Sequence, residues 1–89
     1  PESVTKIGWR AFESCESLTE IIIPEGVIKI ESYTFANCRR LSAVTIPDTV
    51  ILIERSAFAN CNKLTFVKPP RHTVIDKTSF PKTTIIQRR

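Results

Sequence analysis

The sequence predicts a short right-handed repeat solenoid of the α/β type, mostly β, with a parallel sheet and about four coils. Two observations predict it. The same or a similar residue recurs at seven positions of a constant interval, and one of them, a proline, opens every interval. A unit of roughly 23 residues is too short to enclose a core of its own, but stacked units turn each recurring position into a continuous buried row.

The 89 residues divide into repeat units within a single domain. The expected coils are 1–23, 24–46 and 47–69, followed by a degenerate C-terminal capping coil at 70–89. Prolines open them at Pro1, Pro24, Pro47 and Pro70. The other recurring positions are Val4, Val27 and Val50; Ile7, Ile30 and Ile53; Phe12, Phe35 and Phe58; Cys15, Cys38 and Cys61; Leu18, Leu41 and Leu64; and Ile21, Val44 and Val67. Successive coils should lie about 4.8 Å apart, the spacing of paired strands.

The main strand of each coil is predicted before the next proline. Residues 18–23 alternate, with Ile21 and Ile23 facing inward as in a strand, and the counterparts are 41–46 and 64–68. Proline then stops the ladder, because it has no N–H to donate. These segments predict the parallel sheet.

Two further elements complete a coil. Residues 27–30, matched by 50–53, predict a bent strand or an irregular turn, because their inward positions are three residues apart. Residues 34–38 carry Phe35 and Cys38 three residues apart, which predicts a short helical turn, partly 3-10.

One local alternative is an amphipathic helix from Arg10 to Ile22, because its apolar residues share a helical face. The equivalent positions of the third coil, however, carry the β-favouring run Thr65-Phe66-Val67. The proline that opens every repeat also leaves little room for long helices.

The repeat reads Val-x-x-Ile-x-x-x-Ala/Thr-Phe-x-x-Cys-x-x-Leu-x-x-Ile/Val-x-Ile-Pro. This motif resembles the leucine-rich repeats of the BspA-like family, in full to about residue 68 and loosely beyond it. The resemblance implies a leucine-rich-repeat solenoid with a parallel sheet on one face and short helical turns or strands on the other. It also implies a surface-exposed or secreted protein that binds host or partner proteins and has no chemistry of its own.

The C-terminal end departs from the motif. Pro69 replaces an inward isoleucine, so the third strand should be shorter than the first two. The fourth unit runs one residue early, and residues 83–87 predict a final strand that closes the sheet. No cap is visible at Pro1, so we expect upstream repeats or a neighbouring subunit to cover the first coil.

The residue types favour no enzymatic chemistry. The three cysteines have no CxxC pair and face inward, so we expect them to pack as small hydrophobes, with a disulfide or a metal as open alternatives. His72 is the single histidine, and two glycines cannot form a phosphate loop. We therefore expect no enzyme activity, cofactor, metal site or small-molecule substrate. No apolar run reaches the roughly 18–20 residues of a membrane span.

Charge is unequal between the halves. Residues 1–45 carry a net charge of −1 and residues 46–89 carry +5. The basic half could form a patch for an acidic protein, a glycan or nucleic acid, or it could protect an open sheet edge. Few aromatic residues lie among the bases, which disfavours nucleic acid and favours edge protection.

The outward positions of the main strands predict a protein-binding surface. They include Ile22 and Phe66, large apolar residues that are unusual on an exposed face. The predicted surface residues are Glu20, Ile22, Ala43, Thr45, Phe66 and Lys68, with a rim of Arg39, Arg40 and Lys63. The sequence thus predicts a non-enzymatic protein-interaction module of the cell-surface or adhesion type; the alternative is a structural subunit packed within a large assembly.

Overall fold

The structure, a computed structural model, describes residues 6–7 and 12–89, with side chains from residue 12 onward. The predicted positions Pro1 and Val4, and with them the expectation of an uncapped start, lie outside the described residues. Within those residues the chain forms strands and turns and no helix. The alternative helix over 10–22 is therefore wrong from residue 12 onward, where turns precede a strand.

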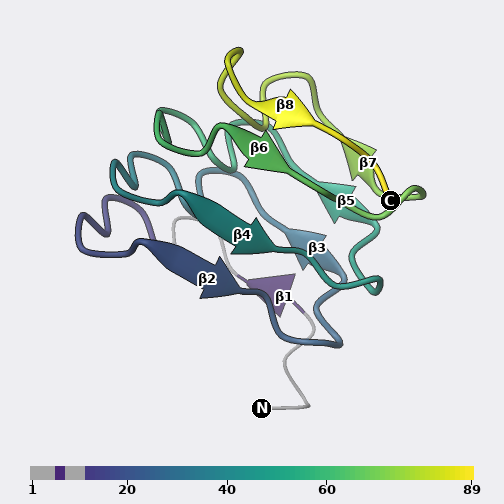
Figure 1. Cartoon of the computed structure of the whole chain (residues 1–89). Helices are drawn as coiled ribbons and strands as arrows, with labels where there is room; N and C mark the ends of the chain where they lie inside the picture. Colours follow the sequence, from purple (N-terminus) through teal and green to yellow (C-terminus); the bar gives the residue numbers. More distant parts are fainter. Residues whose placement is uncertain (1–5, 8–11) are drawn as a thin grey trace.

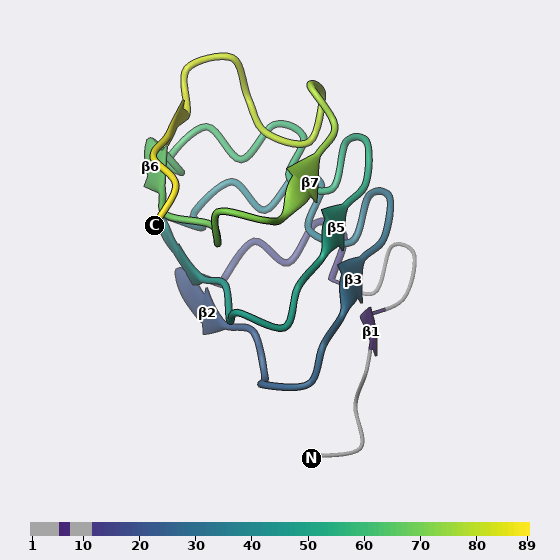
Figure 2. The ribbon, with the colours of Figure 1, turned by 90° about the vertical axis from the view of Figure 1, so that its right-hand side faces the viewer.

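In the described residues, eight short strands lie in two rows on opposite sides of the coiled chain (Figures 1 and 2). The first row is a four-stranded parallel sheet of β1 (Lys6–Ile7), β3 (Lys29–Ile30), β5 (Leu52–Ile53) and β7 (Val74–Ile75). The second row contains β2 (Glu20–Ile22), β4 (Ala43–Thr45), β6 (Phe66–Val67) and β8 (Ile85–Ile86). We call the first row the continuous sheet and the second the split row. Both rows are consistent with a repeat solenoid.

The register follows the sequence repeat. Lys29 pairs with Lys6 and with Leu52, the equivalent positions of the two neighbouring repeats. The next step is one residue shorter, because Leu52 pairs with Val74. The shorter step agrees with the sequence, in which the fourth repeat unit runs one residue early. The last strand also lies within the predicted range, and β8 pairs with β6 after a still shorter interval, that from Phe66 to Ile85.

A ladder of phenylalanines forms the centre of the core, as the sequence predicted. Phe12, Phe35, Phe58 and Phe80 stack with nearly parallel rings, at centroid separations of 5.2, 5.0 and 4.8 Å. Phe35 and Phe58 are completely buried. The stacked rings contact one another from coil to coil, and their burial removes apolar area from water. The ladder therefore connects the two rows of strands through one core.

The segment between the two rows forms single turns in place of the predicted helical turns. The N–H groups of Phe35 and Asn37 donate to carbonyls one coil further on, at 2.8 and 2.7 Å. The alternate N–H groups, of Ala36 and Cys38, donate three residues back within the turn, at 3.1 and 3.3 Å. Because donors alternate between the two kinds of partner, consecutive helical hydrogen bonds cannot form.

The split row corrects the predicted sheet. β2 pairs with β4 and β6 pairs with β8, but in the described chain no ladder joins β4 to β6. The Ile23 N–H donates to the Thr45 carbonyl at 3.0 Å, but the bond one coil further on, from Ile46 N–H to the Lys68 carbonyl, is missing among the described contacts. The continuous sheet forms instead from the segments for which a bent strand or turn was predicted. Strand β6 has two residues against three in β2 and β4, as Pro69 predicted.

Candidate protein-binding surface

The predicted surface residues lie on the outside of the split row, a surface that we call the split face. All six of the predicted strand positions are exposed. The register places Glu20 beside Ala43 and Ile22 beside Thr45. The structure therefore brings these four together on β2 and β4, while Phe66 and Lys68 lie across the break.

The largest apolar contribution to this face comes from two neighbouring side chains, and the sequence predicted only one of them, Phe66, as a surface residue. Phe66 pairs with Ile85 in register, and their exposed fractions are 43% and 63%. Ile85 was missed because the interval from β6 to β8 is shorter than the repeat, so no repeat position pointed to it. The sequence feature that could have indicated Ile85 was the predicted final strand at 83–87, which contains it.

The second predicted apolar residue is separate from this pair. Ile22 is 68% exposed, but its register neighbour is Thr45, and Ala43 occupies the other outward position of β4. The small residues of β4 thus lie between Ile22 and Phe66. The split face has an apolar pair at its β6–β8 end and a single apolar side chain at its β2 end.

A groove of about 430 Å³ follows the break between β4 and β6. Its walls are residues 42–45 on one side and 66–68 on the other, and Arg89 closes one end. On its far side, β6 is fully engaged with β8, since the carbonyls of Thr65 and Val67 accept from Ile85 and Gln87 at 2.9 and 3.0 Å. The edge of β6 towards β4 is the unsatisfied one.

The guanidinium of Arg89 bridges the two strands at the end of the groove. Its Nη1 donates to the Ile46 carbonyl at 2.9 Å and to the Lys68 carbonyl at 2.8 Å. Its Nη2 forms an ion pair with the exposed carboxylate of Asp48. A side chain thus takes the carbonyl that the main chain of β4 would bind in a continuous sheet.

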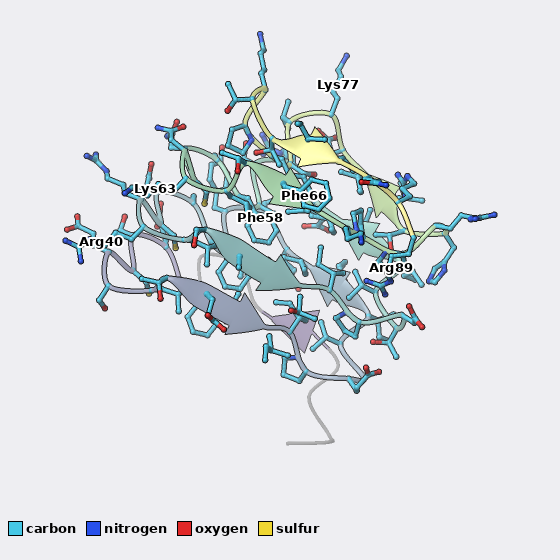
Figure 3. All side chains as sticks on the ribbon, viewed as in Figure 1. Arg40, Phe58, Lys63, Phe66, Lys77 and Arg89 are labelled. Atoms are coloured by element: carbon cyan, nitrogen blue, oxygen red, sulfur yellow. The ribbon has the colours of Figure 1, made fainter. Side chains whose placement is uncertain are left out.

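The predicted rim residues Arg39, Arg40 and Lys63 are exposed in the turns before β4 and β6. Figure 3 shows Arg40 and Lys63 at one end of the split row and Arg89 at the other, with Phe66 between them. The face therefore has cationic side chains at both ends of its strands.

Two further arginines near the C-terminus, Arg71 and Arg88, have contacts with the main chain. Arg88 Nη1 donates to the carbonyls of Pro70, Arg71 and Thr73, at 3.1, 3.2 and 2.6 Å. Arg71 Nε donates to the Arg89 carbonyl at 3.3 Å. These contacts support the edge-protecting role of the basic half, because they cover carbonyls at the end of the stack.

A second exposed apolar feature lies on the continuous sheet and was not singled out from the sequence. Ile28, Ile51 and Val74 project outward from three successive coils and are 43%, 55% and 63% exposed. The N–H of Ile51 donates to the Ile28 carbonyl at 2.8 Å, and that of Val74 to the Ile51 carbonyl at 2.9 Å. We call these three residues the apolar ridge. The sequence signal was the interval of 23 residues that separates these three β-branched residues, although the register pairs Val74 with Leu52.

Two cysteine thiols form hydrogen bonds to the main chain of the preceding coil. Cys38 and Cys61 are free thiols whose Sγ atoms donate to the carbonyls of Phe12 and Phe35, at 3.1 and 3.0 Å. Burial raises the pKa of the Cys61 thiol to about 12 and also raises that of Cys38. Thiols held in the neutral form are poor nucleophiles and poor metal ligands.

The acidic groups form local contacts as well. Glu54 accepts from the Ser32 N–H at 3.1 Å and pairs with Lys29 at 3.5 Å. Hydrogen bonds from Thr78 lower the pKa of the exposed Asp76 carboxyl. In the part of the chain that the structure describes, no group of three or more His, Cys, Asp or Glu side chains converges on a metal-sized site. That same part contains no helix long and apolar enough to span a membrane.

Comparison with protein families agrees with this geometry. Residues 1–88 match the family described as the BspA type leucine rich repeat region (6 copies). Curated proteins and solved structures gave no match. Leucine-rich repeats are generally protein-interaction modules and generally lack catalytic activity of their own. Because the match extends over nearly all 89 residues, the chain belongs to the BspA-type leucine-rich-repeat family.

Proposed function

We propose that this chain is a non-enzymatic protein–protein interaction module of the surface or adhesion type, and that its partner binds to the split face. The observation that carries the proposal is the exposed pair of Phe66 and Ile85 beside the cationic side chain of Lys68. A cell-surface or secreted location follows from the family resemblance alone.

Energetics support a binding role for this face. An exposed aromatic residue next to an aliphatic one gains free energy when a partner removes both from water. Both residues belong to paired strands above a buried core, so little conformational entropy is lost on binding. Basic residues around an apolar centre add specificity and speed the encounter with a partner of opposite charge.

The test is site-specific photo-cross-linking in the intact protein. A photoreactive residue at Ala43, the exposed centre of the split face, should capture a partner protein in its native setting. Phe66→Glu should reduce that cross-linking at least about tenfold, the loss typical of an aromatic anchor. The matched control is Ile51→Glu, which places the same charge on the exposed apolar ridge of the continuous sheet.

Two results would overturn the assignment. Cross-linking that survives Phe66→Glu would show that the partner does not use this face. Equal loss in Ile51→Glu would show a general effect of added charge or of destabilisation. Circular dichroism of both variants identifies the second case.

The apolar ridge favours a second candidate, a structural subunit packed within a large assembly. Three exposed aliphatic side chains on successive coils present an apolar surface suited to packing against a neighbouring subunit. Sedimentation velocity distinguishes the candidates. Association that is lost in Ile51→Glu and retained in Phe66→Glu favours the structural subunit, and a monomer with an intact split-face interaction favours the binding module.

A further inference from the structure

The break in the split row is the feature of this chain that the repeat pattern does not explain. Some Cα atoms of β4 and β6 approach within 8 Å of one another. An additional strand between them would need roughly 9.6 Å, twice the normal strand spacing. A bound chain therefore cannot enter the row as a strand. It can lie across the strands and insert a side chain into the groove.

The two sides of the groove differ in chemistry. Ser42, Ala43 and Thr45 on the β4 side are small and partly polar, while Phe66 on the β6 side is large and apolar. The Phe66 ring has Ile85 beside it on the next strand. An aliphatic side chain inserted into the groove would pack against Phe66 on the β6 side. The small residues on the β4 side would leave room for the main chain that carries it.

The Arg89 end of the groove is positively charged. Lys68 and Arg89 line this corner, and for the described residues Asp48 is the only carboxylate that pairs with either of them. Because Asp48 pairs with Arg89, the ammonium of the exposed Lys68 has no carboxylate partner among the described residues. The corner thus attracts negative charge.

We propose that the groove between β4 and β6 binds an extended acidic segment of a partner protein, with an aliphatic side chain against Phe66 and a carboxylate at Lys68 and Arg89. This inference rests on the proposed protein-binding function and specifies its partner chemistry. Each described feature has a role in it: the apolar wall takes the side chain, the cationic corner takes the carboxylate, and the strand spacing excludes strand insertion.

The same features disfavour nucleic acid. Binding of single strands uses several aromatic side chains as stacking platforms. Among the described residues, Phe66 is the only exposed aromatic side chain. A groove with one apolar wall beside the cations of Lys68 and Arg89 fits an acidic peptide with apolar residues better than it fits a sugar–phosphate chain.

The probe is a fluorescein-labelled peptide in which glutamate alternates with leucine, long enough to cross the split row. Fluorescence anisotropy should show saturable binding that weakens as sodium chloride rises from about 50 mM to about 500 mM, because salt screens exposed charges. A peptide of alternating lysine and leucine should not bind. A peptide of glutamate alternating with serine should bind at least about tenfold more weakly, because it lacks the side chain for the apolar wall.

Two pairs of variants locate the site. Lys68→Glu should reduce affinity at least about tenfold, while the control Lys77→Glu, with the same charge change beyond β7, should change it less than about twofold. Phe66→Ala should also reduce affinity, whereas Ile51→Ala on the apolar ridge should not. All four positions are exposed, so loss of folding does not account for the differences.

The remaining outcomes overturn the proposal in distinguishable ways. Equal losses in Lys68→Glu and Lys77→Glu mean non-specific attraction of charge, and tighter binding of a single-stranded oligonucleotide of equal charge means a polyanion site. Self-association that Phe66→Ala abolishes identifies a second copy as the occupant. If no acidic peptide binds but cross-linking at Ala43 still depends on Phe66, the protein-binding function stands and the acidic partner is wrong. If both fail, the function itself is wrong.

Discussion

The two rows of strands share one core and yet differ in continuity. In the continuous sheet, each step from β3 to β7 repeats its hydrogen bonds, as in the Ile51 to Ile28 and Val74 to Ile51 contacts of 2.8 and 2.9 Å. In the split row, the pairing stops between β4 and β6, where the side chain of Arg89 binds the Lys68 carbonyl. Inward residues recur in both rows, as Ile30 and Ile53 do in the continuous sheet and Val44 and Val67 in the split row.

This difference shows that the stacking of coils and the continuity of the strand ladder depend on different residues. The repeated inward residues fix the stacking of coils, because they fill the rows of the core. Ladder continuity depends also on non-repeated residues at the ends of strands, which compete for main-chain groups. Residues outside the repeat, such as Pro69 and Arg89, therefore give the split face its chain-specific shape.

The largest expected effect comes from the core beneath both rows. Phe58 lies between Phe35 and Phe80 at 5.0 and 4.8 Å and is completely buried. Phe58→Ala should lower the free energy of unfolding by about 3–5 kcal/mol, because it removes buried area and leaves a cavity. Urea denaturation measures the change. Phe66→Ala, an exposed control, should cost less than about 1 kcal/mol, and similar costs for the two would contradict a core at Phe58.

Continuity of the four-stranded sheet can be broken at its centre. Ile51→Pro removes the N–H that donates to the Ile28 carbonyl, and should cost about 3 kcal/mol. Ile51→Thr keeps this N–H and a β-branched side chain, and should cost less than about 1 kcal/mol. Thermal or urea unfolding of the two variants gives the comparison. Equal stabilities would mean that this hydrogen bond does not hold the sheet together.

A smaller effect is expected at the break. Arg89→Ala removes the bridge from Ile46 to Lys68 and the ion pair with Asp48. It should lower the free energy of unfolding by about 1–2 kcal/mol, a value limited by the partial exposure of the side chain. The control Arg40→Ala, in an exposed turn, should change stability by less than about 0.5 kcal/mol. An Arg89→Ala variant as stable as Arg40→Ala would contradict a stabilising role of Arg89 at the break.

The smallest effect at moderately alkaline pH should come from the buried thiol. The pKa of Cys61 is raised to about 12 from its ordinary value of 9.0 because the thiol is buried. The unfolded chain ionises first as pH rises, so the neutral thiol's contribution is complete below pH 9 and is lost between about pH 9 and 12. Cys61→Ala should flatten this decline.

The control for the thiol is a buried substitution that removes no ionisable group. Val50→Ala should reduce stability at every pH and should keep the slope above pH 9. Denaturation midpoints measured across this range give both slopes. An unchanged slope in Cys61→Ala would contradict the burial of the thiol.

The core was predictable because it repeats. The columns of Phe35 and Cys38 indicated stacked rows, and the structure places both side chains in the core. Pro69 likewise predicted the short β6, since proline ends a ladder. The recurring residue types thus predicted the core, and a departure from the repeat at Pro69 predicted the short strand.

The split face was predictable only in part. Exposure of Ile22 and Phe66 followed from strand alternation, but the neighbour of Phe66, Ile85, depends on the shortened interval before β8. The bridge by Arg89 joins residues as many as 43 positions apart in the chain, and no local pattern encodes such a contact. The break between β4 and β6 was for this reason not foreseen.

Native-state hydrogen exchange tests the contrast between the two rows most directly. After correction for intrinsic rates, the amides of Ile51 and Val74, which donate within the continuous sheet, should exchange slowly. Those of Ile46 and Lys68, which have no partner among the described residues, should exchange at least about tenfold faster. Equal protection of all four amides would contradict the break, because it would require a ladder between β4 and β6.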